Sequence, residues 1–120
     1  TPINKQLATG RTFVTLSETG KIQTVHFGEH VCLTFNERSE LFCIQLSGCY
    51  RGLYLNRFGI GTPIQEINAS HPLEFDEGDE VNYPVGQQAS GVSFGGTCCS
   101  LEVDPTQRVS WMTVHDWSRK

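Results

Sequence analysis

The sequence predicts an all-β fold: a single-domain antiparallel β-sandwich of short strands joined by hairpin turns, with a small β-barrel as the alternative. Two observations predict strands. Short runs in which apolar and polar residues alternate recur along the 120 residues, and turn sequences rich in Gly, Pro, Asn and Asp separate them. A third observation excludes helices: alanine, the strongest helix former, occurs only at positions 8, 69 and 89.

One domain is expected over residues 1–120, because a chain of this length buries one core and is too short for two. Residues 1–10 and 115–120 are expected to be loose termini. The chain begins at Thr1 rather than Met, as a mature or trimmed form does.

The clearest predicted element is a β-hairpin over residues 31–47. Apolar and polar residues alternate on both sides of the polar turn 36–39, so one face of the hairpin is expected in the core. The residues expected to face inward are Val31, Leu33, Phe35, Phe42, Ile44 and Leu46.

Further strands are expected where alternation recurs between turn signals. A second hairpin joins 13–16 to 22–27, with Gly20 in the left-handed position of its turn. Residues 84–90 are expected to form a mobile loop. The remaining predicted strands cover 53–58, 64–67, 72–75, 81–83, 91–94, 99–103 and 109–114.

Charge and hydropathy exclude several classes of function. The net charge is −4, the isoelectric point is near 5.5, and the nine Lys and Arg are scattered, so no basic face is available for a nucleic acid. No apolar run approaches the roughly 20 residues of a membrane-spanning helix. No cofactor is expected.

Five cysteines and the sequon Asn68-Ala69-Ser70 favour a secreted, disulfide-containing glycoprotein, with Asn68 as the glycosylation candidate at the surface. If the 36–39 turn is a four-residue loop, Cys32 lies directly opposite Cys43, where a disulfide can form. Pairing of either cysteine with other partners remains open.

The last two cysteines, Cys98 and Cys99, are adjacent at the start of the predicted 99–103 strand and therefore point to opposite faces. Cys99 is the inward one and could form a bridge with Cys49. Cys98 is then the odd thiol, available for a disulfide to a second chain or buried as a free thiol. A disulfide-linked or a non-covalent dimer is therefore among the expected assemblies.

Two sequence motifs resemble catalytic ones but lack the required context. The segment 26–30 matches H-x-x-E-H, which needs a helix, and 91–95 matches G-x-S-x-G, which needs a strand–turn–helix. No catalytic residue is assigned, and the protein is not expected to be an enzyme. The weak metal-ligand candidates are His26 and His30 and, in the acidic run 74–80, Asp76 and Asp79.

The aromatic residues supply candidates for binding, because Trp and Tyr exposed on a sheet stack on sugars or anchor protein interfaces. These candidates are Trp117, Tyr50, Tyr54 and Tyr83.

By elimination, the sequence favours a small secreted binding protein, such as a virulence effector, a toxin-like module or a recognition domain. It would act through loops and one sheet face on a protein partner. A lectin-like module that binds a glycan is the alternative, and a small enzyme or enzyme inhibitor is the second alternative.

Overall fold

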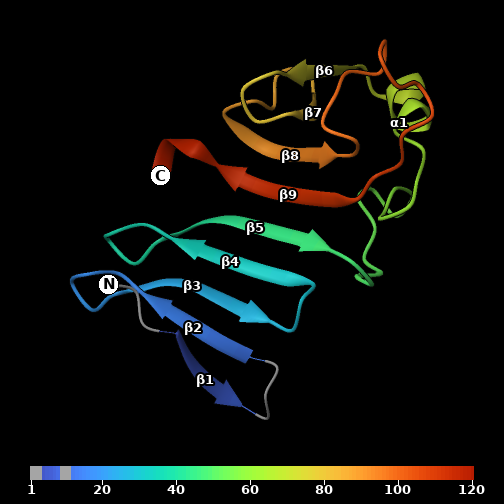
Figure 1. The fold of residues 1–120 in the computed structure, drawn as a ribbon. Helices are drawn as coiled ribbons and strands as arrows, with labels where there is room; N and C mark the ends of the chain where they lie inside the picture. Colours follow the sequence, from blue (N-terminus) through green and yellow to red (C-terminus); the bar gives the residue numbers. More distant parts are fainter. Residues whose placement is uncertain (1–3, 9–11) are drawn as a thin grey trace.

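A computed structural model describes residues 4–8 and 12–120 of the chain, which form one nine-stranded sheet and one α-helix. The strands are arranged in the order β1-β2-β3-β4-β5-β9-β8-β7-β6 (Figure 1). The bounds of the elements are β1 Asn4–Ala8, β2 Thr12–Leu16, β3 Ile22–Phe27, β4 Val31–Phe35, β5 Leu41–Ser47, α1 Ile64–Ser70, β6 Leu73–Asp76, β7 Val81–Pro84, β8 Ser90–Gly95, β9 Trp111–Asp116 and the 3-10 turn η1 Trp117–Arg119.

Every strand pairing is antiparallel, which confirms the all-β antiparallel prediction. The first five strands form a simple up-and-down meander, and the pairing of β5 with β9 joins it to the C-terminal strands (Figure 1). The sheet does not close into a barrel, since β1 and β6 are its two free edges. One open sheet therefore carries all the strands of the domain.

The core lies at one end of this sheet. Helix α1 and the segments that flank it, together with the 96–110 segment, pack on β8 and β9. The buried core residues are Phe58, Ile64, Ile67, Val92, Phe94, Val109 and Met112. None of them lies in β2–β5, where Val14 is the one buried apolar residue. The N-terminal meander thus contributes little to the core.

The prediction of a strand at 64–67 is wrong, because these residues begin α1. Ile64 and Ile67 are three residues apart, which places both side chains on one face of a helix, and both are completely buried. Pro63 precedes the first turn with extended backbone, and the Ile64 amide donates to the Gln107 carbonyl at 3.0 Å. Tertiary burial therefore outweighs the poor helix propensity of this segment.

The predicted strands at 53–58 and 99–103 are also absent. In the first, Leu55 and Asn56 have positive φ values of 55° and 56°, and the chain turns back so that the Tyr54 amide donates to the Phe58 carbonyl at 2.7 Å. In the second, Cys98 has a φ of 63° and residues 101–103 form a turn. Alternating sequence alone does not produce a strand where the backbone adopts left-handed conformations.

The 31–47 hairpin is confirmed, but its register differs from the predicted one. The turn spans five residues, closed by the Asn36 amide on the Glu40 carbonyl at 3.0 Å, and an irregularity follows between Thr34 and Phe35. Cys43 therefore lies opposite Thr34, and Cys32 lies opposite Gln45. The hairpin 13–16/22–27 and the strands near 72–75, 81–83, 91–94 and 109–114 are present with shifted ends.

Both segments expected to be loose termini carry secondary structure where they are described. Residues 4–8 form β1, while 1–3 and 9–10 lie outside the described residues. At the other end, β9 continues to Asp116, and its carboxylate accepts from the Ser118 amide at 3.2 Å to start η1.

Candidate interaction surface

Cross-strand pairing aligns apolar side chains into two continuous rows on one face of the sheet, because directly paired residues point to the same side. We call these rows the valine row and the phenylalanine row, and together the apolar face. The valine row is Val14, Val25, Leu33, Ile44, Val114 and Val92. The phenylalanine row is Phe27, Val31, Leu46, Met112 and Phe94.

The two rows are well covered at the C-terminal end of the sheet and only partly covered over β3–β5. Phe94 and Met112 are buried in the core, whereas Phe27 at the other end of the same row is 47% exposed. In the valine row, Val114 is 46% exposed although β9 is an interior strand paired on both sides. The hairpin residues predicted to lie in the core are only half-buried. The face expected to be the core is therefore partly open to solvent.

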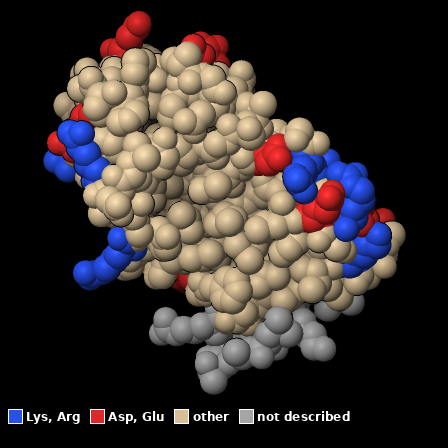
Figure 2. Space-filling model, turned by 180° about the vertical axis from the view of Figure 1, so that it is seen from behind, with Lys and Arg blue, Asp and Glu red and all other residues tan. Residues whose placement is uncertain are grey.

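The strands that carry the apolar face have almost no charge. In β2–β5, β8 and β9, the one Asp, Glu, Lys or Arg is Asp116 at the end of β9. The charged residues of this region lie instead in the turns, as do Lys21 and Arg38. Figure 2 shows the same distribution on one side of the molecule, where charged side chains gather at the margins around an uncharged middle.

The opposite face of the meander is polar but also uncharged. Phe13 and His26 stack with ring centroids 4.5 Å apart, and His26 Nε2 lies 3.0 Å from the Thr24 hydroxyl and 3.8 Å from Cys32 Sγ. Burial raises the pKa of the Cys32 and Cys43 thiols, which keeps both neutral and weakly nucleophilic. This face therefore offers hydroxyls and neutral thiols rather than an activated nucleophile.

None of the predicted disulfides is formed in the structure, where Cys32, Cys43, Cys49, Cys98 and Cys99 are all free. Cys32 and Cys43 share the polar face, as predicted, but the five-residue turn and the irregularity between Thr34 and Phe35 together place them diagonally rather than opposite each other. Cys98 is exposed, and Cys99 is half-buried beside the Thr97 hydroxyl at 3.3 Å. The predicted inward and outward sides do not apply, because the strand that defined them is absent.

The aromatic candidates do not form a common exposed platform. Tyr83 is 7% exposed, and Tyr50 and Tyr54 pack against the core, with Tyr54 edge-on to Phe94 at 5.6 Å. Trp117 is half-buried and stacks on His115 with ring centroids 4.7 Å apart. At least three of these four rings are used in packing.

The metal and glycosylation candidates have local roles. Across residues 4–8 and 12–120, no three His, Cys, Asp or Glu side chains meet in a way that could hold a metal ion. His30 Nδ1 accepts from the Cys49 amide at 3.2 Å, and Asp76 accepts from the Gly78 and Asp79 amides of its own turn. Asn68 lies in α1, half-buried, and its Oδ1 accepts from the Leu73 amide at 2.9 Å.

The segments that matched catalytic motifs are parts of the sheet. Residues 91–95 lie inside β8, and Ser93 is 4% exposed, so this segment is not a strand–turn–helix with an accessible hydroxyl. Residues 26–30 are the end of β3 and the turn that follows it.

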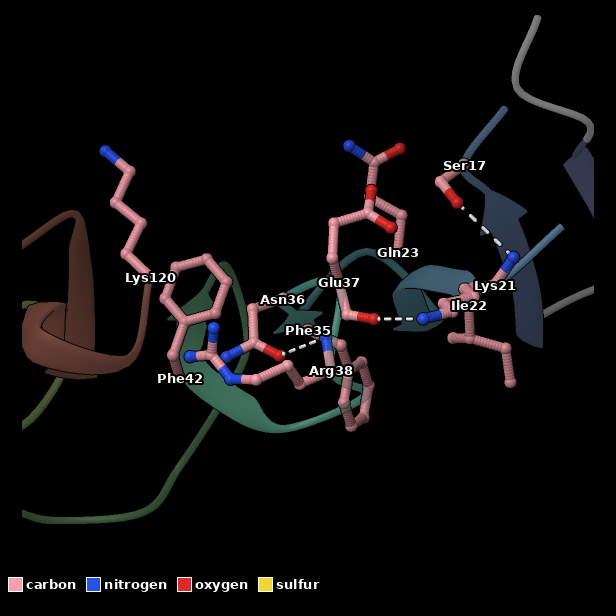
Figure 3. Close-up of a pocket in the computed structure, with 10 residues that line it drawn as sticks. All are labelled: Ser17, Lys21, Ile22, Gln23, Phe35, Asn36, Glu37, Arg38, Phe42 and Lys120. Carbon is pink, nitrogen blue, oxygen red and sulfur yellow. Dashed lines mark hydrogen bonds between the residues drawn. The ribbon is translucent and has the colours of Figure 1, made fainter. Parts of the chain in front are cut away.

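A depression of about 370 Å³ lies where the β2–β3 turn, the β4–β5 turn and Lys120 meet (Figure 3). Its polar groups already bond within the chain: Lys21 Nζ donates to the Glu37 carbonyl at 2.6 Å, and the Arg38 amide donates to Asn36 Oδ1 at 2.9 Å. Hydrogen bonds from Asn36 and Arg38 also lower the pKa of the Glu40 carboxyl. The depression is thus a junction between turns whose charges are largely engaged.

Sequence reasoning missed the partly open apolar face. It identified the alternating residues of the 31–47 hairpin but assigned them to the core. The available signal was the absence of charge from both faces of four consecutive strands, which a solvated sheet face would normally carry.

Within the described residues, no helix is long and apolar enough to cross a membrane. No family model, no curated protein and no solved structure matches this chain.

Proposed function

We propose that this protein is a non-catalytic protein-binding module whose apolar face docks on a protein partner. The observation that carries the proposal is Val114, an apolar side chain that is 46% exposed on an interior strand of the sheet. An antiparallel sheet normally buries one face and solvates the other with polar residues. Here the face that should be buried is only partly covered over β3–β5.

The chemistry of the face favours a protein over other partners. Its two rows contain no charged residue and no hydrogen-bonding side chain, so they offer nothing to a phosphate or a sugar hydroxyl. Contiguous exposed apolar surface rimmed by polar residues is typical of protein–protein contact. The rim is supplied by the turns, which hold charges of both signs, including Lys21, Glu37 and Arg38.

A photo-crosslinking amino acid at position 114 tests the proposal in cells that naturally express the protein. The expected result is a discrete crosslinked protein adduct, because the side chain at 114 would lie in the interface. The matched control is position 45, which is also exposed, lies on the adjacent strand β5 and points to the opposite face. Absence of an adduct at 114, or an equally strong one at 45, would contradict the proposal.

A further inference from the structure

The molecule has more surface than a compact monomer of its mass. The accessible surface is 7367 Å², whereas a folded monomer of this size exposes about 6,500 Å². The radius of gyration is 15.4 Å, against about 13.6 Å for a compact domain of this length. The excess is about 900 Å² over the whole chain, and each partner in a standard interface buries roughly 800 Å².

We infer that the partner of the apolar face is a second copy of this chain, packed face to face about a twofold axis. This inference rests on the proposed function and specifies its partner. In the dimer, the valine and phenylalanine rows of each copy pack on those of the other, so that two sheets form a β-sandwich between chains. Such sheets pack about 10 Å apart with their strands about 30° from parallel.

The uncharged character of the face determines which occupant fits it. An apolar, uncharged sheet is best covered by another apolar, uncharged sheet, because any charged group placed against it would lose its hydration without gaining a partner. The chain itself presents such a sheet, and a twofold interface uses the same patch on both copies. The residues of this patch that are not fully buried lie on four neighbouring strands, β3–β5 and β9.

Exposure also decides which residues can test the interface without disturbing the fold. Val114 and Phe27 are nearly half-exposed, one in each row, so the monomer can place a lysine at either position in water. In the dimer the same lysine would be buried against apolar side chains at a large desolvation cost. Gln45 provides the control on the polar face, since it is exposed and its neighbour Ile44 belongs to the valine row.

Sedimentation velocity over a concentration series, in the presence of a reductant, measures the association directly. The wild type is expected to form a species of twice 13.4 kDa, and the reductant excludes a disulfide through Cys98 as its cause. Val114→Lys and Phe27→Lys are expected to weaken association by about 100-fold or more. Gln45→Lys is expected to associate like the wild type, and unchanged circular dichroism spectra would establish that each variant is folded.

A wild type that stays monomeric throughout the series would overturn the inference, as would equal weakening by Gln45→Lys. If one lysine variant fails to fold, the other still tests the same face, because the two lie in different rows. A monomeric wild type that nevertheless gives a discrete adduct with a different protein from position 114 would remove the second copy and leave the proposed function standing. Absence of both the dimer and the adduct would contradict the inferred dimer and the proposed function together.

Discussion

Gln107 is the clearest case in which a single side chain determines local structure. It is 3% exposed, and its Nε2 donates to the Cys99, Ser100 and Asp104 carbonyls at 2.8, 3.3 and 3.0 Å. Its Oε1 accepts from the Thr97 amide at 3.2 Å. The amide thus replaces the backbone partners that a strand would have supplied to the 97–104 segment. The alternation within residues 99–103 does not predict this partner, because Gln107 lies beyond the end of that run.

We expect Gln107→Leu to destabilise the protein by about 2–4 kcal/mol, because it leaves several backbone groups near the core without partners. Urea unfolding followed by circular dichroism measures the change. Gln45→Leu is the matched control: Gln45 is exposed and has no side-chain hydrogen bond among the described residues, so its replacement should change stability by less than about 0.5 kcal/mol. Equal effects of the two variants would contradict the role assigned to Gln107.

Asp104 contributes to the same loop in a pH-dependent way. Hydrogen bonds from the Thr106 and Thr97 hydroxyls, aided by the Thr106 amide, lower the pKa of its carboxyl. A pKa that is lower in the folded state means that the stabilisation is present above the unfolded value of about 3.9 and is lost as the pH falls through the folded value.

Asp104→Asn is therefore expected to be less stable than the wild type at neutral pH, with the difference shrinking as the pH falls below about 4. Urea midpoints measured at neutral and acidic pH test this. Asp79→Asn is the control, because the Asp79 side chain makes no hydrogen bond among the described residues. A difference between wild type and Asp104→Asn that stays constant with pH would show that the carboxylate charge is not what matters.

The cysteines show what sequence can and cannot fix at this scale. Alternation correctly placed Cys32 and Cys43 on one face, since a change of register by two residues keeps the side of every side chain. Which residue lies opposite depends on the irregularity between Thr34 and Phe35 and on the number of residues in the turn, each of which shifts the register by one residue. The Asn36 side chain sets that number by accepting from the Arg38 and Glu40 amides at 2.9 and 3.0 Å.

At the scale of the elements, the predicted strands that exist are those that pair in the sheet with the strand before or after them in the sequence. The β4–β5 hairpin and the β2–β3 hairpin are of this kind, and local alternation with a turn signal is enough to specify them. The helix α1 is not, because its seven residues are too few to be stable alone and depend on the burial of Ile64 and Ile67. Two isoleucines three residues apart in a short sequence do not predict that burial.

One buried side chain of β9 contacts the loop between β7 and β8. His115, which is 6% exposed, places its Nε2 3.2 Å from the Gln87 carbonyl and 3.0 Å from the Gln88 carbonyl. Two carbonyl acceptors require a proton on Nε2, so the ring donates to both. Sequence predicted a loop at 84–90 but gave no sign of this contact, because β9 lies more than twenty residues further along the chain.

We expect His115→Phe to increase the rate of amide hydrogen exchange in residues 85–89, because the two carbonyls lose their donor while the ring can still stack on Trp117. Mass spectrometry of the exchanged peptides measures this. His115→Gln is the rescue variant, since its amide can still donate to a carbonyl. Exchange in 85–89 that is unchanged in His115→Phe would show that the loop is held by other contacts.

At the scale of the whole molecule, the sequence specifies the class of fold but not where the fold is covered. Alternation is local, and it correctly predicts antiparallel strands with one apolar side. Cover is non-local: α1 and the 96–110 segment bury the apolar rows over β8 and β9, because they are connected to that end of the sheet (Figure 1). The same pattern of residues is therefore core at Phe94 and surface at Phe27.

This asymmetry predicts an uneven distribution of stability within a single sheet. Phe94 and Val92 in β8 are buried among the side chains of α1 and the loops, whereas Leu33 in β4 is only half-buried. Local opening is easier where few apolar contacts must be broken. In dilute, monomeric protein, the amides of β4 should therefore exchange faster than those of β8, although both strands are paired on both sides.

Because β4 is not an edge strand and cannot fray, faster exchange there would result from the smaller number of side chains packed on it and not from missing hydrogen bonds. Equal exchange in the two strands would instead mean that the sheet opens as one cooperative unit, held together by its backbone pairing alone.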